Sequence, residues 1–394
     1  MNMNEQMKES EESILHTYNR FPVVFEKGQG CYLYDSEGKE YLDFAAGIAV
    51  NSLGYHYPGY DEALKDQIDK LMHISNLYYN EPIIEAGAKL VKASKMSKAF
   101  FTNSGTEAIE GALKAAKKYA YVRDGHADHE IIAMNHSFHG RSIGALSVTG
   151  TAHYREPFEP LMGGVKFADF NDLESVKAQI TDKTCAIITE VVQGEGGIYP
   201  AKKEFLEGLR QICDEKDIML IFDEIQCGMG RTGHYFAWQA YGVQPDIMTS
   251  AKALGCGVPV GAFVLNEKAA KASLEPGDHG TTYGGNPFVC AAVSKVFDIY
   301  ENDKIIEHVQ EMTPYLEQKL DEIVAKHECA ARGMGFMQGI VIQGRPVGEV
   351  VKAALAKGLL VISAGSDVLR IVPPLVITKE HIDKMAAILD ECME

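Results

Sequence analysis

The central part of the chain alternates short apolar runs with stretches of helical period. The apolar runs cover residues 99–102, 130–134, 185–192, 218–223, 247–250 and 261–264. Runs of this length, with amphipathic segments between several of them, are typical of strands joined by crossover helices. The pattern therefore predicts an α/β fold in which a mostly parallel sheet lies between helices on both faces.

Both ends of the chain have a different pattern of apolar and polar residues. We expect a helix over 6–18, β-rich runs at 31–35 and 39–44 joined by a turn, and helices over 61–74 and 82–96. Towards the C-terminus the pattern predicts helices over 288–299, 304–326, 348–356 and 379–392, with strands at 336–342, 359–362 and 369–372. We interpret the two ends (1–50 and 291–394) as one small α+β domain beside a large central domain (51–290).

Net charge and the spacing of the cysteines restrict the kinds of partner and the cellular compartment that we expect for the protein. The chain has 394 residues, enough for two domains, and Lys+Arg 38 against Asp+Glu 55 gives a net charge of −17. Such a balance repels nucleic acid and anionic membrane surfaces, so a small molecule or a second copy of the chain is the expected partner. The cysteines show no C-x-x-C spacing and the first residues resemble no targeting segment, which indicates a cytoplasmic protein with reduced thiols.

An acid and a lysine lie at the ends of two predicted strands. Asp223 closes the run 218–222, and Lys252 follows the run 247–251. The carboxyl ends of parallel strands face one crevice, so the two side chains are expected side by side. Pyridoxal phosphate chemistry needs this pair, an amine for the Schiff base and an acid that keeps the pyridine nitrogen protonated. A lysine is more often solvated, but the apolar flanks of Lys252 favour a buried amine with a lowered pKa.

A glycine pattern between these two residues suggests a different cofactor. Residues 228–233 match G-x-G-x-x-G, with Asp246 beyond them, as in a dinucleotide fingerprint. However, residues 224–227 separate the strand from the first glycine, and the following helix can only be short. An NAD-dependent oxidoreductase is therefore kept only as a remote alternative.

The turn after the run 99–102 is a candidate anion site. Ser104, Gly105 and Thr106 begin a strong helix, whose free N–H groups and dipole attract a phosphate. The alternative is a capping box between Ser104 and Glu107 with no ligand.

Three further segments carry polar side chains that could serve a ligand. In 135–142, Phe138 could stack on a planar cofactor and Arg141 could hold a carboxylate. His136 and His139 have no third ligand beside them, so we predict no metal site and expect ordinary hydrogen bonds. In 188–197, Glu190 and Glu195 could act on an arginine or a substrate amine, or be plain strand-end acids.

Two more segments could serve a ligand or could be ordinary surface structure. The loop 278–287 contains the hydroxyls of Thr281 and Thr282, and alone is more typical of a surface turn. Arg370 lies in the β-like run 368–378, where it could be solvated or could point into a cleft.

Taken together, these segments resemble the class III aminotransferases from about Tyr18 to the C-terminus. The motifs occur in the order of that family: FFTNSGTEA (100–108), HSFHGR (136–141), EVVQGEGG (190–197), IFDEIQCGMGRTG (221–233), TSAKALG (249–255), HGTTYGGNP (279–287) and LRIVPPL (369–375). The resemblance implies a fold type I transferase that uses pyridoxal 5'-phosphate. It assigns Lys252 as the Schiff-base lysine and proton shuttle, Asp223 as partner of the pyridine nitrogen and Gln226 as donor to the ring hydroxyl, with Phe138 stacked on the ring.

The resemblance also implies a homodimer with shared active sites. Gly105 and Thr106 would cradle the phosphate, and Thr282 would reach the phosphate of the neighbouring subunit.

For the substrates, the resemblance assigns Arg141 to a carboxylate, with Thr281 close by. Arg370 would bind the carboxylate of 2-oxoglutarate or glutamate, and would pair with Glu195 when the other substrate is present. Ornithine-specific members typically carry a tyrosine where this chain has Gly47, which leaves room for an acylated donor. The expected reaction moves the terminal amino group of N2-acetylornithine to 2-oxoglutarate, a step of arginine biosynthesis, with ornithine, succinylornithine and 4-aminobutyrate as alternative donors.

Overall fold

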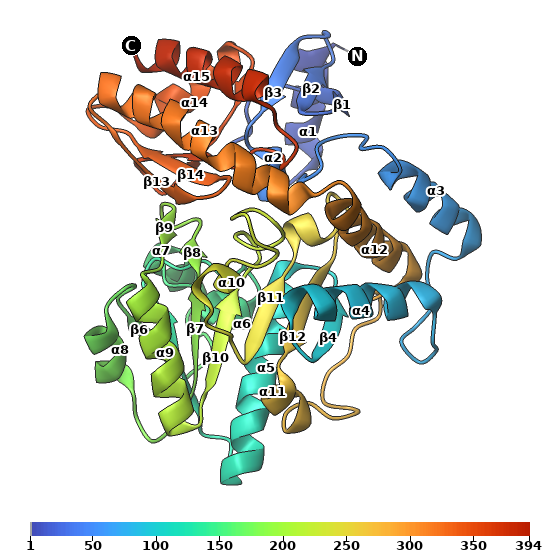
Figure 1. Ribbon diagram of the computed structural model, residues 1–394, viewed down its shortest axis with the longest axis vertical. Helices are drawn as coiled ribbons and strands as arrows, with labels where there is room; N and C mark the ends of the chain where they lie inside the picture. The colour runs from blue at the N-terminus through green and yellow to red at the C-terminus, as the bar shows by residue number, and fades with distance from the viewer. Residues whose placement is uncertain (1) are drawn as a thin grey trace.

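A seven-stranded sheet forms the centre of the computed structural model, which describes residues 2–394 (Figure 1). The strand order is β4-β12-β11-β10-β7-β5-β6. The strands are β4 (Lys98–Thr102), β5 (Glu130–Met134), β6 (Val165–Ala168), β7 (Thr184–Glu190), β10 (Met219–Asp223), β11 (Ile247–Ser250) and β12 (Gly261–Leu265). β6, β5, β7, β10 and β11 are parallel, and β12 runs antiparallel to both of its neighbours. The predicted α/β fold with a mostly parallel sheet is confirmed.

Alternate residues of β10 show why this sheet is covered on both faces. Leu220 and Phe222 belong to one buried cluster, which includes Leu209 of α9 (Lys203–Lys216). Met219 and Ile221 belong to the other cluster, together with Ile109 of α5 (Gly105–Asp124). A strand buried on both faces has no polar side, which explains its continuous apolar run.

The remaining helices of this part surround the sheet and its loops. They are α3 (Tyr60–Lys70), α4 (Glu81–Ser94), α6 (Ile143–Ser147), α7 (Ala152–Arg155), η1 (Glu156–Phe158), α8 (Leu173–Gln179), α10 (Trp238–Tyr241), η2 (Lys252–Leu254), α11 (Glu267–Lys271) and α12 (Pro287–Asn302). The run predicted as one strand over 185–192 divides into β7 and a short β8 (Val192–Gln193), which pairs with β9 (Tyr199–Pro200). The sequence pattern missed β6, whose half-buried residues give no continuous apolar run.

Strands from both chain ends meet in one sheet above the central one (Figure 1). Leu42 of β3 pairs in parallel with Leu359 of β15. The strands of this region are β1 (Phe25–Gln29), β2 (Tyr32–Asp35), β3 (Glu40–Asp43), β13 (Ala330–Met334), β14 (Met337–Val341), β15 (Leu359–Leu360), β16 (Ile362–Ala364) and β17 (Val368–Ile371). Its helices are α1 (Met3–Ser13), α2 (Ala46–Ala49), α13 (Ile305–Lys326), α14 (Val347–Ala356) and α15 (Lys379–Met393). The first helix starts and ends earlier than expected, and the division at residues 50 and 290 stays a prediction.

Across residues 2–394, no helix is both long and apolar enough to cross a bilayer. All eight cysteines are free thiols, as the sequence predicted.

Candidate active site

Three polar residues lie in register at the carboxyl ends of neighbouring parallel strands. Asp223 of β10 is paired with Glu190 of β7 on one side and with Thr249 of β11 on the other. Asp223 and Glu190 line a cavity of about 510 Å³, and Lys252, just beyond β11, lines it too. The acid and the lysine are therefore brought to one crevice, as the pattern of apolar runs predicted.

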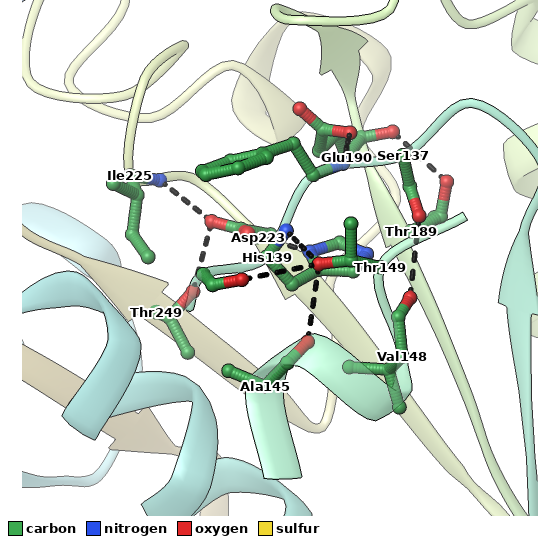
Figure 2. Close-up of polar contacts among 12 residues, drawn as sticks. Ser137, His139, Ala145, Val148, Thr149, Thr189, Glu190, Asp223, Ile225 and Thr249 are labelled. Carbon is green, nitrogen blue, oxygen red and sulfur yellow. Dashed lines mark hydrogen bonds and ion pairs between the residues drawn. The ribbon is translucent and has the colours of Figure 1, made fainter. Parts of the chain in front are cut away.

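Hydrogen bonds fix the carboxylate of Asp223, which lines the cavity (Figure 2). One oxygen accepts from the Ile225 N–H at 3.0 Å and from the Thr249 hydroxyl at 3.1 Å. The other oxygen lies 2.7 Å from Nδ1 of the buried His139 ring. The carboxylate is thus held in one orientation, ready to accept a further proton donor from the cavity.

His139 is a functional candidate that the sequence did not reveal. We expected an ordinary loop histidine, but its ring lies beneath Asp223 in the core. The second histidine of the motif, His136, lines a different cavity. The His139–Asp223 contact spans 84 positions, so only the fold could show it.

The amine of Lys252 has a lower pKa than an ordinary lysine. Lys252 has a positive φ of 48°, which turns the chain sharply after β11. Burial, and after it the nearby Arg370 guanidinium, lowers its pKa to about 8. A neutral, nucleophilic amine is therefore accessible near neutral pH, as Schiff-base chemistry requires.

The start of α5 offers unpaired donors to an anion. The Ser104 hydroxyl accepts from the Glu107 N–H at 3.3 Å, and the Glu107 carboxylate accepts from the Asn103 N–H at 2.7 Å. Within residues 2–394, no hydrogen bond uses the N–H of Gly105 or Thr106. Capping and anion binding are therefore compatible here, because each uses different N–H groups.

Gly105 is needed for packing as well as for ligand approach. A Cβ at this position would lie 2.9 Å from Ile225 Cδ1. The Thr106 hydroxyl lies 2.7 Å from the Ser142 hydroxyl, which donates to Glu110 at 2.6 Å. This chain of hydrogen bonds fixes the Thr106 hydroxyl at the edge of the cavity.

A buried arginine reaches the cavity through Gln226, although it is not itself one of the residues that line the cavity. Arg370 of β17 forms a bidentate ion pair with Glu195 at 2.5 and 3.3 Å, and donates to the Gln226 carbonyl at 3.0 Å. Burial of Glu195 opposes its ionisation, but the Arg370 guanidinium outweighs burial and holds the pKa of Glu195 below its usual value. Arg370 is therefore buried and ion-paired rather than solvated, and the cleft that it lines is a second one, separate from the cavity of Lys252.

Glu190 connects two loops of the same site. Its carboxylate accepts from the Phe138 N–H at 3.3 Å and the Gly194 N–H at 3.1 Å. Burial, together with the Asp223 charge, raises its pKa to about 7. Glu190 thereby links the loop of Phe138 to the loop of Glu195.

Three of the remaining predicted residues line the cavity and two do not. Phe138, Arg141 and Gln226 line the cavity. Thr281 accepts from the Asn103 side chain at 3.2 Å, which places it beside the start of α5. Thr282 is exposed and does not line the cavity of its own chain.

The glycine pattern at 228–233 does not form a nucleotide-binding turn. The segment before α10 is an irregular loop, closed by the Glu224 carboxylate, which accepts from the Ala237 and Trp238 N–H groups at 2.8 Å each. The buried Arg231 guanidinium donates to backbone carbonyls of Phe336 and Pro373. This loop packs the central sheet against the C-terminal region and presents no helix start to a phosphate.

Comparison with known proteins assigns the family. The class-III aminotransferase family matches residues 14–393. The chain belongs to the class III aminotransferases. This aminotransferase is 47% identical to acetylornithine aminotransferase from Clostridium acetobutylicum, over 98% of this chain and 100% of that one. It is 44% identical to succinylornithine transaminase from Yersinia pseudotuberculosis, over 94% and 92% of the two chains. An ornithine aminotransferase structure from Toxoplasma gondii, with PLP at partial occupancy in its active site, superposes with a TM-score of 0.95 at 28% identity, over 100% of this chain and 94% of that one.

The cavity of this aminotransferase fits pyridoxal 5'-phosphate, the cofactor of its class. The unpaired N–H groups at Gly105 and Thr106 suit a phosphate, the Asp223 carboxylate suits a protonated ring nitrogen, and the Lys252 amine suits an aldehyde carbon. The enzyme is therefore a pyridoxal-phosphate-dependent aminotransferase.

Proposed function

We propose that this aminotransferase moves the terminal amino group of N2-acetyl-L-ornithine to 2-oxoglutarate, giving N-acetylglutamate 5-semialdehyde and glutamate. The observation that carries the proposal is the 47% identity to an acetylornithine aminotransferase over the full length of that protein. N2-succinylornithine is the second candidate donor, because a succinylornithine transaminase is 44% identical.

Lys252 and Asp223 carry the chemistry in this proposal. Bound pyridoxal phosphate supplies an electrophilic carbon and a ring that withdraws electrons from the reacting substrate carbon. The Lys252 amine would take the proton from the substrate carbon that bears the amino group and, as general acid, would return it to the carbon that the cofactor supplies. The Asp223 carboxylate holds a proton on the ring nitrogen, and the His139 contact keeps that carboxylate in place.

Other cavity residues orient the cofactor. The N–H groups of Gly105 and Thr106 would hold the phosphate, and Phe138, which lines the same cavity, would pack on the ring. The Arg370 guanidinium donates to the side-chain oxygen of Gln226. The group of Gln226 that would face the ring hydroxyl is therefore its side-chain NH₂, which is a donor.

The Arg370–Glu195 pair allows one pocket to take two kinds of substrate. When the acylated donor is bound, Glu195 neutralises Arg370. When 2-oxoglutarate enters, its carboxylate takes the place of Glu195 on the same guanidinium. Exchange of one carboxylate for another keeps the buried arginine paired throughout.

The absence of a side chain at Gly47 supports an acylated donor. Gly47 is exposed and lies in a left-handed turn, with φ of 62° at Gly47 and 66° at Ile48. The neighbouring Val50 lines the cofactor cavity. A Cβ at position 47 would lie 3.2 Å from the Asn51 side-chain nitrogen and 3.8 Å from the Val50 Cβ, so a bulky side chain there would crowd the wall of the cavity. Glycine avoids this crowding, which favours a donor with an acyl group.

A panel of amino donors tests the proposed reaction. With 2-oxoglutarate as acceptor, we expect kcat/KM to be highest for N2-acetylornithine, followed by N2-succinylornithine, with ornithine and 4-aminobutyrate lower. Gly47→Tyr should lower kcat/KM for N2-acetylornithine roughly tenfold more than for ornithine, because the ring overpacks the acyl site.

The control variant is Gly47→Ala, which carries the same left-handed backbone strain without the ring. It should change both donors by a similar factor. If N2-acetylornithine is among the poorer donors of the wild-type enzyme, the proposed reaction is wrong.

We also propose that the enzyme is a homodimer in which Thr282 contacts the phosphate of the neighbouring subunit. Exposed apolar side chains at Leu77, Tyr79 and Tyr283 support this assembly. Asn76 donates to the Gly284 carbonyl, so these side chains belong to adjoining segments of the surface. Large exposed apolar patches mark interfaces.

Light scattering coupled to gel filtration tests the assembly, with an expected mass of twice the 43.3 kDa chain. Thr282→Val should weaken cofactor retention while the mass stays that of the dimer. A monomer with full activity would contradict the shared site.

A further inference from the structure

Arg141 is held by aromatic rings and not by hydrogen bonds. Its guanidinium carbon lies 3.9 Å from the ring centre of Tyr154 and 5.3 Å from that of Phe138. The two rings meet edge to face, with centroids 6.1 Å apart. Throughout residues 2–394, no hydrogen bond and no ion pair uses the Arg141 N–H groups.

This arrangement differs from that of the other substrate-facing arginine. Arg370 is occupied by Glu195, and a ligand must displace that carboxylate. A guanidinium that stacks on a ring keeps its donors in its own plane, free for a bidentate carboxylate. Stacking therefore restricts the orientation of Arg141 without using any of the groups that bind substrate.

Tyr154 is itself anchored to the core. It lies in the short helix α7 beside Arg155, whose guanidinium donates to the Thr149 carbonyl at 2.5 Å and stacks on Phe167 at 4.1 Å. The Thr149 hydroxyl accepts from the His139 N–H at 3.0 Å. Tyr154 is therefore tied to the same loop that carries Phe138 and Arg141.

We propose that Tyr154 is a positioning residue that fixes the Arg141 guanidinium for the donor carboxylate, and so contributes to selection of amino donors that carry one. The inference rests on the proposed role of Arg141 as the carboxylate-binding residue. Without the ring, the side chain of the exposed Arg141 would sample several rotamers, and binding would have to restrict it.

A pair of donors that differ only in the carboxylate isolates this role. N-acetyl-1,4-diaminobutane is N2-acetylornithine without its carboxylate. In the holoenzyme, Tyr154→Leu should lower kcat/KM for N2-acetylornithine roughly tenfold, mainly through KM, and should leave kcat/KM for N-acetyl-1,4-diaminobutane within about twofold. Tyr154→Phe keeps the ring and should behave as the wild type.

Binding of an unreactive ligand gives a second readout. N2-acetylnorvaline has the carboxylate and the acetyl group but lacks the reacting amine. Calorimetry on the holoenzyme should show its Kd raised roughly tenfold by Tyr154→Leu and unchanged by Tyr154→Phe. The matched control is Tyr121→Ala. The Tyr121 ring lies under the Lys118 amine at the far end of α5, and its loss should leave kcat/KM unchanged for both donors.

Arg141→Ala separates the two proposals. If Arg141→Ala reduces activity with N2-acetylornithine but Tyr154→Leu does not, the role of Tyr154 is wrong and that of Arg141 stands. If Arg141→Ala affects both donors equally, the carboxylate is bound elsewhere and both proposals fail. Equal losses with both donors in Tyr154→Leu would show a general structural defect and would also overturn the inference.

Discussion

Replacement of Lys252 with alanine is expected to lower the transamination rate by about 10⁴-fold or more, because it removes the only group proposed to move the substrate proton. The other groups lining the cavity that can exchange a proton are His139, Glu190 and Asp223, and each is already engaged in hydrogen bonds. The rate of a single turnover with N2-acetylornithine, followed by cofactor absorbance, measures this loss directly.

Chemical trapping identifies the lysine independently of the rate. Borohydride reduction of the wild-type holoenzyme should fix the cofactor to the peptide that contains Lys252, and no such peptide should form in Lys252→Ala. Because burial lowers the pKa of this amine to about 8, covalent uptake by cofactor-free enzyme should speed up as pH rises and level off above about 8. Lys271→Ala, on the exposed face of α11, is the control and should retain full activity. Cofactor mass on any other lysine would overturn the assignment.

The acid–lysine pair could be predicted because it depends on local features of the sequence. Continuous apolar runs identified β10 and β11 as buried strands, and parallel strands present their carboxyl ends on one edge of a sheet. Asp223 and Lys252 follow those runs directly. Their proximity therefore required only the strand positions and a parallel pairing.

Contacts that depend on tertiary packing could not be predicted in the same way. His139 reaches Asp223 only because the loop after β5 folds under the end of β10. Tyr154 meets Arg141 through a helix of four residues, α7, too short to give an apolar period. The family resemblance supplied Arg370 and Glu195, whereas the residue pattern alone left both with a plain solvated alternative.

Replacement of Asp223 with asparagine is the other large expected effect. The asparagine oxygen can still accept from the Ile225 N–H and the Thr249 hydroxyl, so the fold of the strand end is retained. Its amide, however, carries no charge and offers hydrogen atoms to the ring nitrogen and to His139, where the carboxylate accepted them. Loss of one preorganised charge at a reacting centre costs roughly 10³-fold in kcat, about 4 kcal/mol of activation free energy.

A cofactor analogue separates the charge of the ring nitrogen from other effects of this change. In Asp223→Ala, which leaves space at the ring nitrogen, an analogue with a methylated and permanently positive nitrogen should recover a large part of the lost rate, whereas ordinary pyridoxal phosphate should not. Thr249→Val serves as the graded control, since it removes one hydrogen bond to the carboxylate but keeps the charge, and should cost only a few-fold in kcat. The rates report the chemical step only if each variant binds as much cofactor as the wild type does. Cofactor content is therefore measured after gel filtration. Equal rates with the two cofactors in Asp223→Ala would mean that Asp223 acts by holding the cofactor in place and not by maintaining the ring proton.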